Sequence, residues 1–123
     1  SEISLHDVVF EAQRGITNRN AKDIQLHNVR VNTTAGSSLK ADNVERLLVS
    51  GFETAKPIAE KSVITLNNTK GALLQNSWPF SDTKKYLEIT GAETKDINLR
   101  NNLFTNELIL VGKEVDTKEV KRN

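Results

Sequence analysis

The chain has 123 residues, of which 37% are hydrophobic and 5% aromatic, and its 17 basic and 16 acidic side chains leave a net charge of +1. This balance lacks the basic footprint of a nucleic-acid-binding protein and gives no attraction to an anionic membrane surface, and no apolar run approaches the roughly 20 residues of a membrane span. The absence of cysteine excludes disulfides, thiolate catalysis and cysteine-type zinc sites. We expect one domain with no nucleic-acid or membrane partner and no cofactor.

Five similar stretches recur along the chain, and their starts lie 21, 23, 25 and 25 residues apart. They are Ile3–Val8, Ile24–Val29, Leu47–Phe52, Ala72–Ser77 and Ile97–Asn102. The first and third residues of each stretch are apolar, and this period of two predicts a half-buried strand. We place these strands at 3–6, 24–27, 47–50, 72–75 and 97–100. A repeat of this length is typical of stacked solenoid coils, none of which can bury its apolar face alone.

After each predicted strand comes a residue type that tolerates left-handed backbone geometry. This column consists of Asp7, Asn28, Gly51, Asn76 and Asn101. A bend there leads into a second strand, whose apolar residues are Val8 and Phe10, Val29 and Val31, Phe52, and, one place later, Trp78 and Phe80 and then Leu103 or Phe104. If the polar side chains of the column point inward, they form a hydrogen-bonded structural ladder, which we expect in preference to a calcium site.

A third strand precedes each stretch, because Ile16, Leu39, Ile64 and Ile89 all lie eight residues before the first apolar column. Leu110 belongs to the last such strand. A short polar corner follows the third strand and carries Asn20, Asn43, Asn68 and Glu93 at one position. The opposite corner varies in length, over 11–14, 32–38, 53–62 and 81–86. Variable loops on one edge of a solenoid are where binding functions gather.

These patterns predict an all-β fold, a right-handed, single-stranded parallel β-helix of about five coils with three short strands each, over residues 1–112. Residues 113–123 are mostly charged, and we expect a polar capping or disordered tail. The first coil, beginning at Ile3, exposes an apolar end. We therefore expect either an end-on homo-oligomer or missing N-terminal coils.

The phrases Asp23–Val31 and Ser4–Ala12, the latter followed by Gly15 and Ile16, resemble the C-terminal coils of glycoside hydrolase family 28, the polygalacturonase-like parallel β-helices. The resemblance covers most of the chain and implies a secreted or periplasmic pectin-degrading parent and a pectic polysaccharide partner. The family's catalytic motifs, an Asn-Thr-Asp stretch, an Asp-Asp pair, a Gly-His-Gly turn and an Arg-Ile-Lys stretch, do not occur here. Because inverting hydrolysis needs two suitably spaced carboxyl groups, we assign no catalytic residue and expect the chain alone to be inactive.

Several polar and aromatic groups remain as candidate contacts. His6 and His27 stack at one outward column, where we expect exposed polar residues and no metal site. Basic residues on the polar corner alternate with acids, which predicts a solvated surface. Trp78 and Phe80 follow an alternation that favours core packing. We therefore place the substrate contacts on the neighbouring loop, and the candidates are Tyr86, Lys84, Lys85 and Asp82.

The resulting functional expectation is a non-catalytic C-terminal β-helix segment of a pectin-degrading, polygalacturonase-like hydrolase. Two alternatives stay open. The chain could be a carbohydrate-binding or adhesion solenoid without catalysis, or a purely structural solenoid that associates with itself.

Overall fold

The computed structural model describes residues 3–55, 57–58 and 60–122, and the chain forms an all-β parallel β-solenoid of about five turns. The side chains of Phe10 and Ala12 are not among those described. The inward position expected for Phe10 therefore stays a prediction. The described residues contain two helical segments, the short 3-10 turns η1 (Asn106–Leu108) and η2 (Thr117–Glu119). Neither is long enough to cross a membrane.

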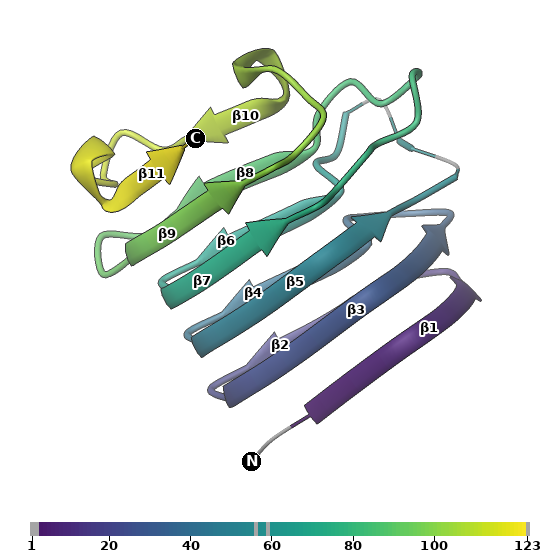
Figure 1. Cartoon of the computed structure of the whole chain (residues 1–123), viewed down its shortest axis with the longest axis horizontal. Helices are drawn as coiled ribbons and strands as arrows, with labels where there is room; N and C mark the ends of the chain where they lie inside the picture. The colour runs from purple at the N-terminus through teal and green to yellow at the C-terminus, as the bar shows by residue number, and fades with distance from the viewer. Residues whose placement is uncertain (1–2, 56, 59, 123) are drawn as a thin grey trace.

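Two parallel sheets lie on opposite sides of the core, and each coil contributes one strand to each sheet (Figure 1). The larger sheet contains β1 (Ile3–Ala12), β3 (Lys22–Thr33), β5 (Glu45–Glu53), β7 (Lys70–Gln75), β9 (Lys95–Arg100) and β11 (Val120–Arg122). The smaller sheet contains β2 (Ile16–Arg19), β4 (Leu39–Asp42), β6 (Ile64–Asn67), β8 (Leu87–Thr90) and β10 (Ile109–Val111). The chain passes from one sheet to the other and advances as a right-handed coil (Figure 1).

The register of the larger sheet confirms the predicted apolar columns. Ile24 lies opposite Ile3 on one side and Leu47 on the other, and Leu26 stands in the same relation to Leu5 and Val49. The central members of these columns are fully buried. Burying such side chains stabilises the fold by about 1.5–3 kcal/mol each, so the repeat positions of the sequence are the core of the solenoid.

The bend column does not separate two strands as predicted. The backbone is left-handed at Asp7, Asn28 and Gly51, with φ of 53°, 54° and 72°, yet β1, β3 and β5 each continue through the bend. After Asn76 and Asn101 no strand follows among the described residues before the next sheet. A coil therefore has two strands, one of them bent, rather than three short strands, because a single left-handed residue turns the chain without ending its pairing with the neighbouring coil.

The side chains of the bend column point outward, contrary to the inward ladder considered above. Asp7, Asn28, Asn76 and Asn101 are all exposed. The Asn28 Nδ2 atom donates to Asp7 Oδ1 at 2.8 Å, and Asn101 Nδ2 donates to Asn76 Oδ1 at 2.7 Å. At Gly51 the column has no side chain, and Asn76 Nδ2 donates instead to Ser50 Oγ at 3.4 Å. The contacts join neighbouring coils from the solvent side.

The smaller sheet departs from the predicted spacing in its last coils. Ile64 lies opposite Leu87, and Ile89 lies opposite Leu66, two residues from the predicted pairing of Ile64 with Ile89. A shift of two keeps every side chain on its own face, so Ile89 is still buried. The same shift places Gly91, with φ of 98°, in the corner position that we had assigned to Glu93.

Both ends of the solenoid differ from its middle. Residues 113–122 are folded, because β11 pairs with β9 and the Val115 side chain is buried in the hydrophobic core. The disordered alternative for this tail is therefore wrong for the described residues. At the other end, β1 pairs only with β3 among the described strands, and Ile3 is exposed.

Candidate functional site

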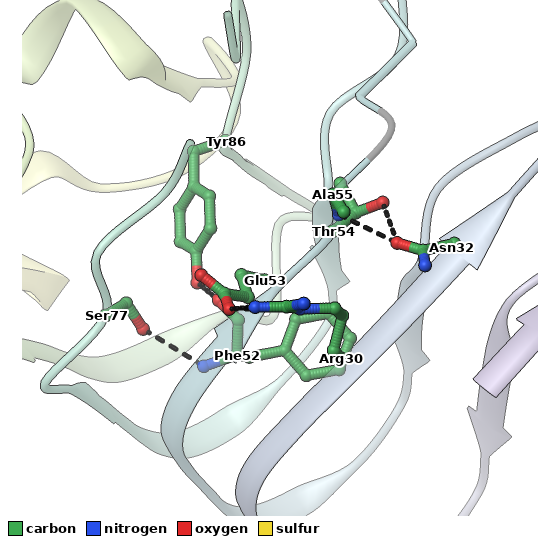
Figure 2. A network of polar contacts seen from close by, with 8 residues as sticks. All are labelled: Arg30, Asn32, Phe52, Glu53, Thr54, Ala55, Ser77 and Tyr86. Atoms are coloured by element: carbon green, nitrogen blue, oxygen red, sulfur yellow. Dashed lines mark hydrogen bonds and ion pairs between the residues drawn. The ribbon is translucent and has the colours of Figure 1, made fainter. Parts of the chain in front are cut away.

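Tyr86 is not an exposed contact, and this prediction is wrong. Its side chain is 0% exposed, its hydroxyl donates to the carbonyl oxygen of Phe52, and its ring packs on Phe104 with centroids 4.9 Å apart. Burial raises the pKa of the phenol far above its usual value, and the Glu53 carboxylate adds to this rise while a hydrogen bond with Ser77 opposes it. Tyr86 is therefore a neutral donor that joins two coils through the core (Figure 2).

The other three predicted contacts lie at the surface. Asp82, Lys84 and Lys85 are exposed in the loop before β8. The loop turns there, because the Thr83 backbone N–H donates to the Phe80 carbonyl at 3.0 Å. These charges form no ion pair within the described residues, so they are available to a ligand, and a contact role for them stays a prediction.

Trp78 and Phe80 point outward, contrary to the core packing expected from the sequence. Trp78 is 73% exposed and Phe80 is 37% exposed, whereas the alternate residues Ser77 and Pro79 are buried. The expectation assumed a one-residue shift at the bend after Asn76. No shift occurs, because Ser77 takes the inward place directly after the bend and its Oγ accepts the Phe52 backbone N–H at 3.4 Å.

A groove of about 450 Å³ lies beside these aromatic rings on the loop edge of the solenoid. Its lining residues are Arg30, Glu53, Trp78, Pro79, Phe80 and Ser81. The Arg30 Cζ atom lies 5.0 Å from the centroid of the Phe80 ring, close enough for a cation–π contact. Arg30 Nε also donates to Glu53 Oε1 at 3.1 Å. The groove thus combines an exposed indole with a guanidinium and a carboxylate that hold each other in place.

The polar contacts behind the groove fix the strands and loops that form it (Figure 2). Asn32 Oδ1 accepts from Thr54 Oγ1 at 3.2 Å and from the Ala55 backbone N–H at 2.7 Å. These bonds tie the loop after β5 to β3 in the coil before it. They hold the chain directly after the lining residue Glu53 against the neighbouring coil.

The pairing of Arg30 with Glu53 was missed in the sequence, although the signal was present. Each residue lies two positions after the bend column, Arg30 after Asn28 and Glu53 after Gly51. Positions equally far from the bend are neighbours on adjacent coils, as the register of β3 and β5 shows. Opposite charges at such positions predict an ion pair.

This combination of groups suits the recognition of a sugar. A pyranose ring presents an apolar face of C–H groups, which packs on an aromatic plane, and a rim of hydroxyls, which exchange hydrogen bonds with carboxylate and guanidinium groups. Glu53 is the one carboxylate among the lining residues that the structure describes, and Arg30 binds it.

The two histidines make their contacts with neighbouring side chains of the larger sheet. The rings of His6 and His27 stack with centroids 4.5 Å apart and planes 2° apart, and Ser4 Oγ lies 2.8 Å from His6 Nε2. Within the described part of the chain, no group of three or more histidine, cysteine, aspartate or glutamate residues is placed to hold a metal ion. The rings of His6 and His27 form a stacked column on the surface of the larger sheet.

The fold defines the chain as a parallel β-solenoid with a loop edge that carries an aromatic groove. Comparison with protein-family models, with curated proteins and with solved structures finds no match to this chain.

Proposed function

We propose that this chain is a non-catalytic β-solenoid segment that binds polysaccharide along its loop edge, with Trp78 as the platform for a sugar ring. The observation that carries the proposal is the position of Trp78, which is 73% exposed beside a groove although the chain has no other tryptophan. Burial of a large apolar side chain contributes about 1.5–3 kcal/mol to stability, and an indole exposed to water does not make this contribution. A ligand that covers the ring recovers this free energy.

The coil pattern supports a narrower proposal about the origin of the segment. The register of the solenoid follows the repeats of Ser4–Ala12 and Asp23–Val31, the phrases that resemble polygalacturonase-like coils. On this basis the chain is a C-terminal part of a secreted or periplasmic pectin-degrading hydrolase, and the polysaccharide is pectic. The segment would stabilise the catalytic coils of the parent enzyme and lend it a substrate contact.

Titration with polysaccharides tests the proposal. Isothermal titration calorimetry with polygalacturonate oligomers and with a neutral oligosaccharide should give saturable binding to at least one of them. Trp78→Ala should weaken that binding about tenfold or more, because buried aromatic anchors dominate recognition surfaces. Leu110→Ala is the matched control, since it removes a 52% exposed apolar side chain from β10 of the smaller sheet, which does not line the groove. The mixtures should release no reducing ends.

The outcomes separate the two levels of the proposal. Binding of the neutral oligosaccharide alone would support a carbohydrate-binding solenoid and reject the pectic ligand. Equal affinity of Trp78→Ala and the unchanged protein would reject the groove as the binding site, and release of reducing ends would reject the non-catalytic assignment.

A further inference from the structure

Four basic side chains converge on a second pocket, which lies on the outer side of the smaller sheet where the chain enters β2 and β4. The pocket has a volume of about 360 Å³. Its lining includes the cations Arg14, Arg19, Lys40 and Lys61 together with Thr17 and Gly36. No acidic residue is among the described residues that line it.

The strand register brings Arg19 and Lys40 close to each other, and the loops add Arg14 and Lys61. Thr17 lies opposite Lys40, and Arg19 lies two residues after Thr17 and therefore on the same face of β2. The acid nearest in register is Asp42, which lies opposite Arg19. The Asp42 Oδ1 atom accepts a hydrogen bond from Asn67 Nδ2 at 2.9 Å. Glu88 follows Lys40 along the same outward column two rungs, or about 10 Å, away.

All four cations are exposed and lack an anionic partner. None of them forms an ion pair within the described residues. On the polar corner the situation is reversed, because Lys22 pairs with Glu45 at 3.5 Å and Lys70 pairs with Glu93 at 3.4 Å. The chain has a net charge of only +1. The positive potential of this pocket is therefore a local feature of the arrangement and not a property of the whole surface.

The walls of the pocket are fixed by backbone contacts. Gly15 packs so closely on the next coil that an added Cβ would lie 2.0 Å from the Ser38 carbonyl oxygen. The Ala35 backbone N–H donates to the Gln13 carbonyl at 3.0 Å, and Thr33 Oγ1 donates to the Gly36 carbonyl at 3.1 Å. At Gly36, with φ of +80°, an added Cβ would meet nothing within 4 Å, so this side of the pocket is open to a ligand.

We propose that this pocket binds an oxyanion, a carboxylate, sulfate or phosphate group. The Arg14 and Arg19 guanidinium groups can donate in pairs to the oxygens of such a group, and Lys40 and Lys61 add two ammonium charges. The four like charges repel one another, and a bound anion lowers that repulsion. The inference goes beyond the polysaccharide groove, because it rests on other residues and on charge rather than on aromatic stacking.

Titration with three probes at low ionic strength tests the site. The probes are inorganic sulfate, inorganic phosphate and trigalacturonate, each followed by calorimetry with chloride as the background anion. Lys40→Gln combined with Lys61→Gln should weaken binding about tenfold or more, because hydrogen bonds to charged groups are lost. Lys113→Gln combined with Lys118→Gln lowers the net charge equally at exposed positions outside the pocket, and it should change binding less than twofold.

The probes also distinguish the source of the oxyanion. Trigalacturonate binding at least tenfold more tightly than the inorganic ions would place the group on an acidic glycan, whereas equal or tighter binding of sulfate or phosphate would indicate a free ion. Equal weakening in the two double variants would overturn the proposal, as would the absence of binding above chloride. Arg14→Gln provides a second test, and thermal unfolding of each variant confirms that it is folded.

Discussion

The two edges of this solenoid are built on different rules. On one edge the chain crosses from the smaller to the larger sheet at nearly constant length, with two residues between β2 and β3, between β4 and β5 and between β6 and β7. On the other edge the chain returns through loops of very different length, over 13–15, 34–38, 54–63 and 76–86. The aromatic groove lies on this second edge, and the basic pocket is formed by loops of this edge together with the outer face of β2 and β4.

The short edge is held by local geometry and by contacts between coils. Asn20, Asn43 and Asn68 adopt left-handed backbone with φ of 50°, 54° and 47°, and Asn43 Nδ2 donates to Asn20 Oδ1 at 2.7 Å. Three basic side chains beside this edge, Lys22, Arg46 and Lys70, pair with acids of the neighbouring coil, as in the contact of Arg46 Nε with Asp23 Oδ1 at 3.3 Å. The comparison teaches that the constant edge sets the register of the coils, whereas the variable edge carries the exposed indole of Trp78 and the charges of Asp82, Lys84 and Lys85, unpaired among the described residues.

The largest loss of stability is expected from a cavity in the core between the two edges. Leu66 on β6 is 0% exposed, so Leu66→Ala should lower the free energy of unfolding by about 2–5 kcal/mol through lost burial and an added cavity. Leu110→Ala, the same change at the 52% exposed residue on β10, should cost about 0.5 kcal/mol or less. Urea unfolding measures both, and similar losses would contradict the view that the columns, and not the ends, carry the stability.

A smaller effect is expected at Tyr86, which links the variable edge to the core. Tyr86→Phe leaves the Phe52 carbonyl without its donor and should cost about 1–3 kcal/mol at pH 7. Because burial raises the folded-state pKa above the value of about 10 in the unfolded chain, the unfolded state binds fewer protons above pH 10. Above pH 10 the contribution of Tyr86 to the free energy of unfolding should then fall by up to about 1.4 kcal/mol per pH unit. Tyr86→Phe lacks this contribution.

The measurement is direct because Tyr86 is the chain's only tyrosine. Phenolate absorbance above pH 10 should appear together with unfolding, and the advantage of the unchanged protein over Tyr86→Phe should shrink as the pH rises. Phenolate absorbance that develops while the protein remains folded would show that Tyr86 is open to solvent.

The contrast between the edges also explains what could be predicted from the sequence. Ile24, Leu26 and Leu47 were placed correctly, because they lie a fixed distance after a corner of fixed length. The pairing of Ile89 was misplaced by two residues, because the longer corner after β8 hides the true period of that coil. The spacing between similar stretches gives only the number of residues in a coil. It does not show at which corner of the coil additional residues lie.

The site was predicted less well than the fold for a related reason. Trp78 and Tyr86 exchange their expected positions, since the first is exposed and the second is buried. Both lie in the long return loop, where no repeat constrains the side chains and an aromatic residue fits either environment. The basic pocket was missed because its four cations are scattered in the sequence. Arg14, Arg19, Lys40 and Lys61 meet only through the register of β2 and β4 and the loops before β2, β4 and β6.

The smallest effect is expected on the constant edge, at Asn43. Asn43→Ala removes the hydrogen bond that Asn43 donates to Asn20. It also leaves an alanine in left-handed backbone, which asparagine tolerates better. The free energy of unfolding should therefore fall by about 1 kcal/mol. Asn43→Gly also removes the donor but adopts this geometry freely, so it separates the two causes. A smaller loss for Asn43→Gly than for Asn43→Ala in urea unfolding would show that backbone conformation sets this edge. Equal losses would assign the effect to the amide contact, and no loss in either variant would mean that the register is fixed by the apolar columns alone.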